Sequence, residues 1–293
     1  MTAAGQKLII AWSWISSLIL VGAVAAIVCF LLFKGLAALN LRLIFGSTEP
    51  LAALLLQKPV FDGILPAMAG TLILVLAATG MALPVGLATG IYLAEYSQGR
   101  IKQLLSLLFD VLAGIPSIVV GLFGFSMAVF LHHHLSSRIY PCLFISAVSL
   151  AFLVLPYLIR STQAAMESLP AKERITAPAL GATKLQNICH VLVPRALDGI
   201  VSGVILSIGR CAEDTAVIML TGAVATAGIP GSVLSTYEAL PFYIYYISSQ
   251  YMDQQELLNG YGAAIILLVI CSGLFFISLG IKKGLGRRFS KKI

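Results

Sequence analysis

Residues 63–94 read GILPAMAGTLILVLAATGMALPVGLATGIYLA, a run of 32 residues that contains no Asp, Glu, Lys or Arg. A helix that crosses a bilayer needs about 20 consecutive apolar residues, so the run is long enough for one span. We place this span at Ala67–Ala94, with Pro66 at its start. Pro84 then falls inside the helix and is expected to kink it, because proline donates no hydrogen bond and crowds the preceding turn.

Similar apolar runs recur along the chain. They predict five further spans, at Leu8–Phe33, Val111–Leu131, Ile139–Ile159, Gly199–Gly222 and Leu257–Ile281. The composition agrees, since 59% of the residues are hydrophobic and 11% are charged, whereas about 25% of the residues in a soluble domain are charged. The mean hydropathy is +0.98. So little polar surface indicates a polytopic membrane protein and excludes a soluble enzyme, a disordered chain and a disulfide scaffold.

The basic residues are distributed unevenly between the two sides of these spans. Fourteen of the 19 fall at the N-terminus, in the loops 95–110 and 160–198, and after residue 281, whereas four fall on the other side and Arg210 lies within a span. Because cytoplasmic loops are enriched in Lys and Arg, both termini are predicted to be cytoplasmic. The net charge of +7 therefore reports orientation in the lipid bilayer and gives no reason to expect a nucleic-acid partner.

The longest cytoplasmic loop, residues 160–198, carries the most informative pattern. Residues 169–194 read LPAKERITAPALGATKLQNICHVLVP, which predicts two short amphipathic helices, the first broken near Gly181 and the second ending before Pro194. The residues alone leave two interpretations open. The loop is either a solvated connector or a docking surface that inserts a helix into a groove of a cytoplasmic partner.

Part of this loop resembles a motif of the permease subunits of ABC importers, which reads Glu-Ala-Ala, three residues, Gly, nine residues and Ile-x-Leu-Pro. Ile175 and Thr176 stand where the motif has its glutamate and first alanine. The resemblance implies a coupling segment that sits in a groove of an ATPase subunit. The residues assigned to this segment are Ala177, Gly181, Ala182, Val191, Val193 and Pro194.

Three further segments resemble the phosphate-specific, PstA-type permeases: GIYLAEYS at 90–97, DVLAGIPSIVVGLFG at 110–124 and GRCAEDTA at 209–216. This resemblance covers roughly residues 63–281. It implies an all-α type I ABC importer transmembrane domain in the inner membrane, which translocates inorganic phosphate without being an enzyme itself. It also implies four kinds of partner: two ATPase subunits that bind the ATP, a second PstC-like permease, an external phosphate-binding protein and the lipid bilayer.

The same resemblance divides the chain into three parts. Residues 1–62 form an N-terminal helix and a first external loop, residues 63–284 form the membrane domain with its loop 160–198, and residues 285–293 form a basic cytoplasmic tail. No cofactor is expected on this chain, because ATP would be bound by the partner and the sequence has no P-loop GxxxxGK[ST]. Five cysteines without CxxC pairing and three adjacent histidines give no convincing metal site.

Three ionisable residues, Arg210, Glu213 and Asp214, fall within the predicted span Gly199–Gly222. Charged residues inside a membrane are costly, by about 2.5–3.5 kcal/mol each at the bilayer centre on translocon scales. In a continuous helix both carboxylates lie within reach of the guanidinium, at i,i+3 and i,i+4. The group is therefore either a self-neutralising structural cluster or the polar lining of an ion path.

By resemblance, Arg210 and Asp214 match the family's pattern, whereas Glu213 replaces a glycine. We expect Arg210 to contact the translocated anion, since a guanidinium donates two parallel hydrogen bonds to oxyanions, and Asp214 to orient it. Glu213 and Thr215 complete the expected path. The extra Glu213 leaves open a permease for another oxyanion such as sulfate or molybdate, or the PstC-type partner. A rival from another class is an ion-coupled secondary transporter, although the first three spans hold no comparable charged cluster.

Overall fold

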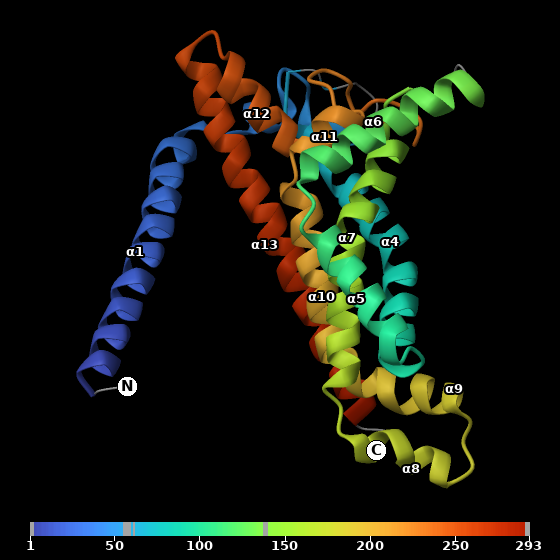
Figure 1. The fold of residues 1–293 in the computed structure, drawn as a ribbon. Coiled ribbons are helices and arrows are strands. Elements are labelled where there is room, and N and C mark those ends of the chain that lie inside the picture. The colour runs from blue at the N-terminus through green and yellow to red at the C-terminus, as the bar shows by residue number, and fades with distance from the viewer. Residues whose placement is uncertain (1–2, 55–59, 61, 137–139, 291–293) are drawn as a thin grey trace.

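The computed structural model describes residues 3–54, 60, 62–136 and 140–290, and this part of the chain consists of helices joined by loops, with one isolated β-bridge between Ala223 and Tyr237 (Figure 1). The elements are α1 (Ala3–Gly35), η1 (Leu36–Ala38), α2 (Leu41–Phe45), α3 (Pro50–Leu54), α4 (Leu65–Glu95), α5 (Gly99–Ala113), α6 (Ser117–His134), α7 (Leu143–Glu167), α8 (Ala171–Ala179), α9 (Lys184–Asn187), η2 (Ile188–Leu192), α10 (Val193–Glu213), α11 (Ala216–Thr221), α12 (Leu240–Gln250) and α13 (Gln254–Ser290).

Within the described residues, six helical stretches are long and apolar enough to cross a membrane, as the sequence predicts. They are Gly5–Ala38, Leu65–Glu95, Ser117–His134, Leu143–Glu167, Lys184–Glu213 and Gln254–Gly284. Figure 1 shows that α1 begins and α13 ends at the same end of the bundle as α8, which agrees with both termini lying on one side. Four basic residues of the topology count, Lys58, Arg138, Lys291 and Lys292, lie outside the described residues.

The third predicted span, Val111–Leu131, is wrong in its boundaries. The structure ends α5 at Ala113 and starts α6 at Ser117. Pro116 lies in this gap, and proline disfavours helical backbone in the residue before it. Helix α5 is attached to α7 by ion pairs, such as the one between Asp110 Oδ1 and Arg160 Nε at 2.8 Å.

The fifth predicted span, Gly199–Gly222, is also wrong, because the helix breaks at Asp214 and resumes at Ala216. The second short helix predicted in the loop is expected to end before Pro194, and the structure does not end it there. It continues from α9 through a π-helical turn, η2, directly into α10. Pro194 lies in the first turn of α10, where the missing N–H breaks no α-helical hydrogen bond.

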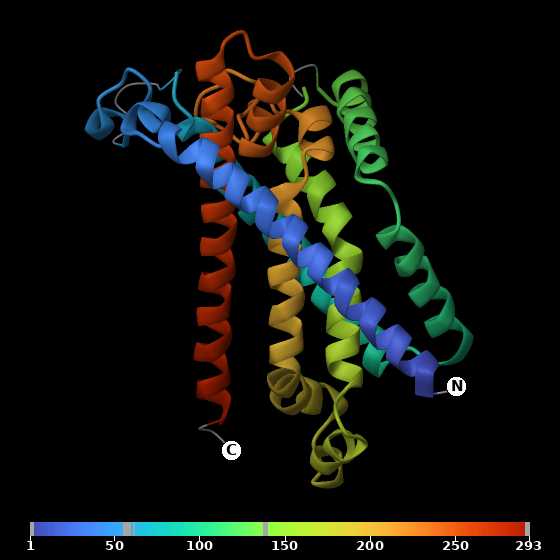
Figure 2. The same ribbon diagram turned by 90° about the vertical axis from the view of Figure 1, so that its left-hand side faces the viewer.

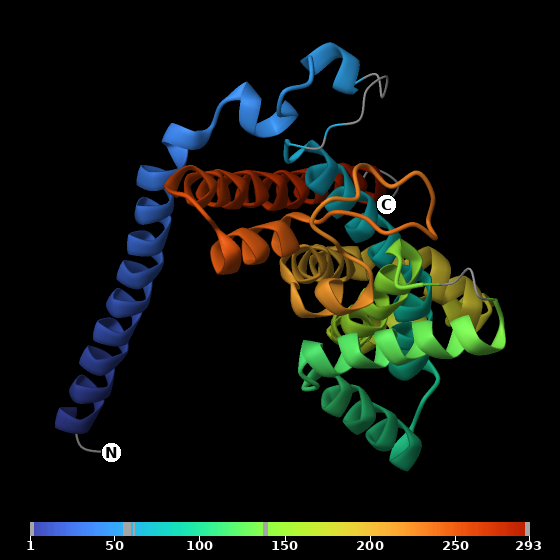
Figure 3. The same cartoon turned by 90° about the horizontal axis from the view of Figure 1, so that it is seen from above.

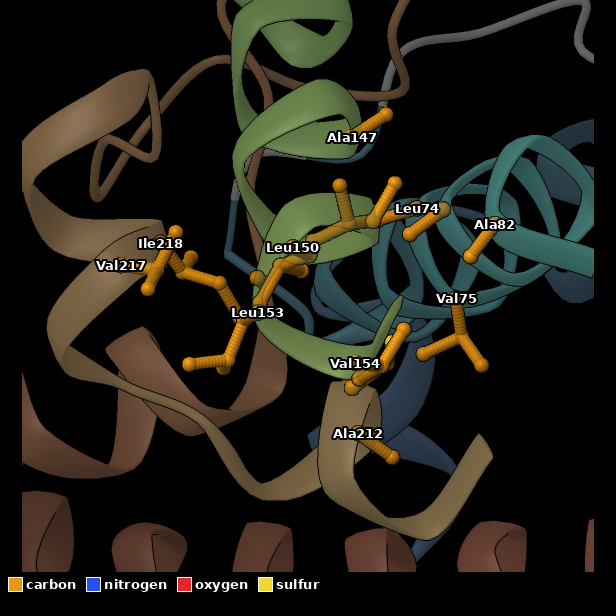
Figure 4. Close-up of a cluster of buried hydrophobic side chains, with 14 of the residues drawn as sticks. Leu74, Val75, Ala82, Ala147, Leu150, Leu153, Val154, Ala212, Val217 and Ile218 are labelled. Carbon is orange, nitrogen blue, oxygen red and sulfur yellow. The ribbon is translucent and has the colours of Figure 1, made fainter. Parts of the chain in front are cut away.

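The core of the membrane domain lies where α4 packs against α7. Leu74 and Val75 of α4 meet Leu150 and Val154 of α7 in a buried apolar cluster (Figure 4). Further along the interface a Cβ on Gly90 would come within 2.6 Å of the Thr162 Cβ. Small residues that let two backbones approach are the usual means by which membrane helices associate. Helix α4 continues through Pro84 as a single element.

Helix α1 is attached to this bundle only near its C-terminal end. There Gly35 packs against α13, and the ring of Phe30 meets that of Tyr261 edge to face at 5.8 Å. Figures 1 and 3 show α1 standing apart from the other helices along most of its length, and Figure 2 shows it crossing the bundle at an angle. Its exposed side chains, such as Trp12 and Trp14, therefore form an apolar surface typical of a lipid-facing helix.

Candidate functional site

The break between α10 and α11 carries the ionisable residues of the predicted path. Asp214 follows α10 in extended backbone, with φ −75° and ψ 112°. Its side chain is buried, and its Oδ1 accepts a hydrogen bond of 2.8 Å from the N–H of Val217. Thr215 is half-buried and leads into α11 with helical backbone, and its carbonyl oxygen accepts from the Met219 N–H at 2.9 Å. Asp214 is thus the cap that starts α11.

Arg210 lies in the last turn of α10 and pairs with Glu213, with Nη1 3.1 Å from Oε1. The guanidinium also lies over the ring of Tyr157 on α7, 5.7 Å from its centroid. Both partners of the pair are exposed, with 43% and 64% of their side-chain surfaces accessible. The i,i+3 contact expected from sequence is present. The i,i+4 contact is replaced by the cap, because the helix ends at Glu213 and Asp214 turns towards α11.

This arrangement separates the four predicted path residues into two groups. Arg210 and Glu213 project from the surface of the chain, whereas Asp214 is buried and Thr215 half-buried. Irregular backbone at membrane depth is tolerated where it is buried in protein or lines a water-filled cavity, and charged side chains there face the same places. Charged side chains at membrane depth are therefore expected to face something other than lipid.

The predicted loop 160–198 is ordered as the end of α7, then α8, α9, η2 and the start of α10. Gly181 follows α8 with φ +89°, a conformation that residues with a side chain rarely adopt. Thr183 then caps α9, because its hydroxyl accepts from the Gln186 N–H while the Gln186 side chain accepts from the Thr183 N–H. The loop is a defined turn between two short helices, as its sequence predicts.

Apolar side chains are exposed on this loop, at or beyond the ends of the spans. Ile175, Leu180 and Leu185 are each more than 60% accessible, although the loop lies at the end of the bundle away from α12. By contrast, five of the residues assigned to the coupling segment by resemblance are half-buried and one, Gly181, is exposed. Those five residues are Ala177, Ala182, Val191, Val193 and Pro194. The coupling segment assigned by resemblance does not include these three exposed residues.

A second buried carboxylate lies in the chain between α11 and α12. Glu238 accepts hydrogen bonds from the N–H groups of Ala227 and Gly228, at 2.9 and 2.8 Å. Burial raises the pKa of this carboxyl group, while the two backbone hydrogen bonds oppose the shift. Next to it, the Leu240 N–H donates to the Thr71 hydroxyl of α4 at 2.9 Å. Sequence reasoning did not single out Glu238, because its partners are backbone groups of a loop without a motif.

Comparison with known proteins matches residues 86–291 to the family described as "Binding-protein-dependent transport system inner membrane component". A PstA phosphate transport permease of Haemophilus influenzae is 31% identical over 92% of this chain and 92% of its own length. The PstA 1 protein of Mycobacterium tuberculosis strain CDC 1551 is 34% identical over 73% of this chain and 69% of its own.

Solved structures show the same fold at low identity. A chain of a bacterial alginate ABC transporter aligns with a TM-score of 0.63 and 15% identity, covering 94% of this chain and 96% of that one. A chain of the MetNI methionine ABC transporter aligns with a TM-score of 0.60 and 17% identity, covering 82% and 99%. The chain therefore belongs to the family of inner-membrane components of binding-protein-dependent transport systems, and its relatives include the PstA permeases.

Proposed function

We propose that the chain is the membrane-spanning permease of an ATP-driven importer for inorganic phosphate. The single observation that supports this most strongly is the similarity to named PstA phosphate permeases along nearly the whole chain, 31% identity over 92% of it. As a permease of this family the chain is a transport subunit and not an enzyme. The secondary-transporter alternative has no support, because the family is binding-protein-dependent.

Membership in the family implies an external substrate-binding protein and a separate ATPase. We propose in addition that two ATPase subunits and a second, PstC-like permease complete the transporter. The exposed Arg210–Glu213 pair supports the second permease, because a charged surface beside a helix break must be covered by something other than lipid. The path would then run between the two permeases, along the face of α10 that carries this pair.

In this path Arg210 is the residue that would contact the anion. Its guanidinium is accessible and can donate two parallel hydrogen bonds to an oxyanion. Asp214 and Thr215 would serve the path by holding the break from which Arg210 projects, since Asp214 caps α11. Glu213 would favour phosphate, because inorganic phosphate keeps a proton near neutral pH and can donate it to a carboxylate. Sulfate and molybdate have no such proton and would be repelled.

On the cytoplasmic side we propose that Ile175, Leu180 and Leu185 enter a groove of an ATPase subunit. Their exposure at or beyond the ends of the spans favours the docking interpretation of the loop over a solvated connector. The half-buried residues from Ala177 to Pro194 would shape the loop that presents them. ATP-driven closure of the ATPases would then move this loop and open the path inward.

The test is ATP-dependent uptake of radiolabelled phosphate into proteoliposomes that contain the complete transporter and its binding protein. We expect uptake with ATP, and a loss of about tenfold to a hundredfold in Arg210→Gln, since hydrogen bonds to charged groups contribute about 1.5–3 kcal/mol. Arg100→Gln, an arginine outside the path at the start of α5, is the matched control. Uptake driven by a proton gradient without ATP, or unchanged uptake in an assembled Arg210→Gln transporter, would overturn the corresponding part of the proposal.

A further inference from the structure

We infer that Glu95, the last residue of α4, is a positioning residue that makes α4 follow the movement of the cytoplasmic loop. This inference rests on the proposed function, because it concerns how force from the ATPase would reach the membrane helices. It concerns a residue outside both the helix break and the exposed apolar tip of the loop. The evidence lies in the contacts at the two ends of α4.

At its cytoplasmic end α4 packs through Leu87, Ile91 and Ala94 against the apolar cluster that contains Ile188 and Leu192 of the loop. The hydrogen bond and the ion pair that join α4 to the two short helices of the loop are both made by Glu95. The carboxylate pairs with the guanidinium of Arg174 on α8. The backbone carbonyl oxygen accepts a hydrogen bond of 2.5 Å from Nζ of Lys184 on α9. The same ammonium group lies over the ring of the next residue, Tyr96, at 4.4 Å. Both short helices of the loop are therefore bound to one residue of α4.

Arg174 extends this connection to the remaining elements at that end of the bundle. Its Nη2 donates to the carbonyl oxygen of Met166 near the end of α7, at 2.7 Å. Its own carbonyl oxygen accepts from the Asn187 side-chain amide at 3.0 Å. Movement of α8 thus cannot leave α4 and α7 behind without breaking charge-assisted hydrogen bonds.

The charges around Glu95 explain why these contacts define one arrangement of α4 and the loop. Glu95 has only 7% of its side-chain surface exposed, and it sits at the C-terminus of a helix, where the helix dipole disfavours negative charge. Arg174 and Lys184 bring two positive charges to the same point. A buried ion pair is weak evidence for stability, since apolar residues often serve as well, and is better understood as a device that defines one geometry.

The external end of α4 contacts the loop that carries Glu238. The Thr71 hydroxyl accepts from the Leu240 N–H, and a Cβ at Gly70 would collide with the carbonyl oxygen of Glu238. Between its ends α4 is 31 residues long, roughly 46 Å at 1.5 Å per residue. A single helix therefore joins the cytoplasmic loop, through Glu95, to the external loop, through Thr71.

The loop is joined to α10 in a different way from α4. The loop is continuous with α10 through η2, so α10 follows the loop by covalent linkage. Helix α4 has no such linkage, because α5, α6 and α7 separate it from α8 in the chain. Helix α4 therefore follows the loop through noncovalent contacts, which are its apolar packing against α7 and η2 and the polar contacts of Glu95.

The experiment measures phosphate imported per ATP hydrolysed by the reconstituted transporter in Glu95→Gln, Arg174→Gln and the double variant. We expect Glu95→Gln to retain ATP hydrolysis and to lower the ratio about tenfold, within the range of about 5–150-fold typical of coupling between sites. The double variant is expected to be no worse than either single variant, because the two residues act through one contact. A ratio is independent of how much transporter assembles.

Lys184→Met provides a milder variant on the exposed side of the contact, and Lys172→Met on α8 is its matched control. We expect an intermediate ratio in the first and an unchanged ratio in the second. An unchanged ratio in Glu95→Gln, additive losses in the double variant, or equal effects of the two lysine variants would each overturn the inference. Failure of the unsubstituted transporter to import phosphate would instead overturn the proposed cargo, and the ratio would then be measured with sulfate or molybdate.

Discussion

The helix pair α4–α7 and the external joint, which we define as residues 214–239, share one apolar cluster and differ in the part that polar contacts play. The pair is held by apolar side chains and by glycines that allow close backbone contact, such as Gly90 against Thr162. The external joint is held by two buried carboxylates, Asp214 and Glu238, that accept backbone N–H groups. The geometry of the first region is set by volume, whereas the second combines apolar packing by Val217, Ile218 and Tyr237 with hydrogen bonds to two buried carboxylates.

This difference shows where the chain can change shape. A close-packed interface tolerates little displacement, because each shift creates a clash or a cavity. A segment held by single polar contacts can rearrange by exchanging those contacts. We therefore expect α4–α7 to move as one unit, while the external joint changes conformation during transport. The following predictions test this comparison, in order of decreasing effect.

The largest effect is expected from Gly90→Val. A Cβ at this position would lie 2.6 Å from the Thr162 Cβ and 2.8 Å from the Ile159 carbonyl oxygen. We expect destabilisation by about 3 kcal/mol, the upper part of the range for overpacking, measured by thermal unfolding in detergent. Gly80→Val on the same helix is the control, because a Cβ there meets nothing within 4 Å. Equal melting temperatures for the two variants would show that α4–α7 is not set by volume.

A smaller effect is expected from Glu238→Ala. The change leaves the N–H groups of Ala227 and Gly228 without their acceptor, and a buried unsatisfied donor costs about 1–3 kcal/mol. Glu238→Gln is the matched variant, since its side-chain carbonyl oxygen can accept both hydrogen bonds. We expect faster hydrogen exchange of residues 222–239 in the alanine variant only. Identical exchange in both variants would contradict the role of this side chain.

Asp214→Ala is expected to lower stability by about 1 kcal/mol, the usual cost of removing a helix cap. Asp214→Asn retains the oxygen that accepts from Val217 and is expected to keep most of the stability. The difference should appear as a shift of about 2–4 °C in the melting temperature. If the asparagine variant were as unstable as alanine, the negative charge and not the cap would be the important property of Asp214.

The smallest effect concerns pH at the external joint. Burial raises the pKa of Glu238 above its ordinary value of 4.5, so the folded joint binds a proton more readily than the unfolded chain. Its stability is therefore highest below pH 4.5 and falls as the pH rises through the raised pKa. After correction for intrinsic exchange rates, we expect protection of residues 222–239 to decrease over this window. Glu238→Gln should abolish the dependence, and protection that rises with pH would contradict the prediction.

Most of the membrane architecture could be predicted from sequence, because uncharged runs and the positions of Lys and Arg report directly on the bilayer. These signals predict the six spans and the placement of both termini on one side. The turn at Gly181 follows from another local signal, the glycine itself. The boundaries of two spans were predicted wrongly, because the local break signal of Pro116 between α5 and α6 was not used, and α10 ends at Glu213 within another apolar run.

Sequence analysis named the residues of the candidate site, but it did not predict how they are arranged. Arg210 and Glu213 pair as their spacing indicates, since that contact depends only on a local helix. Asp214 differs because its partner is a backbone N–H of the following helix, which a continuous-helix interpretation does not contain. The site residues remain proposals until uptake is measured in the variants.

The sequence by itself predicted six membrane spans, a basic side that faces the cytoplasm, and a resemblance to an importer permease. These properties depend on residue type and order along the chain. Only the tertiary structure decided that Asp214 is a cap, that Glu238 holds a loop, and that Glu95 meets Arg174 and Lys184. Arg174 is 79 residues from Glu95 in sequence, and contacts over such distances depend on how helices pack, which no local pattern encodes.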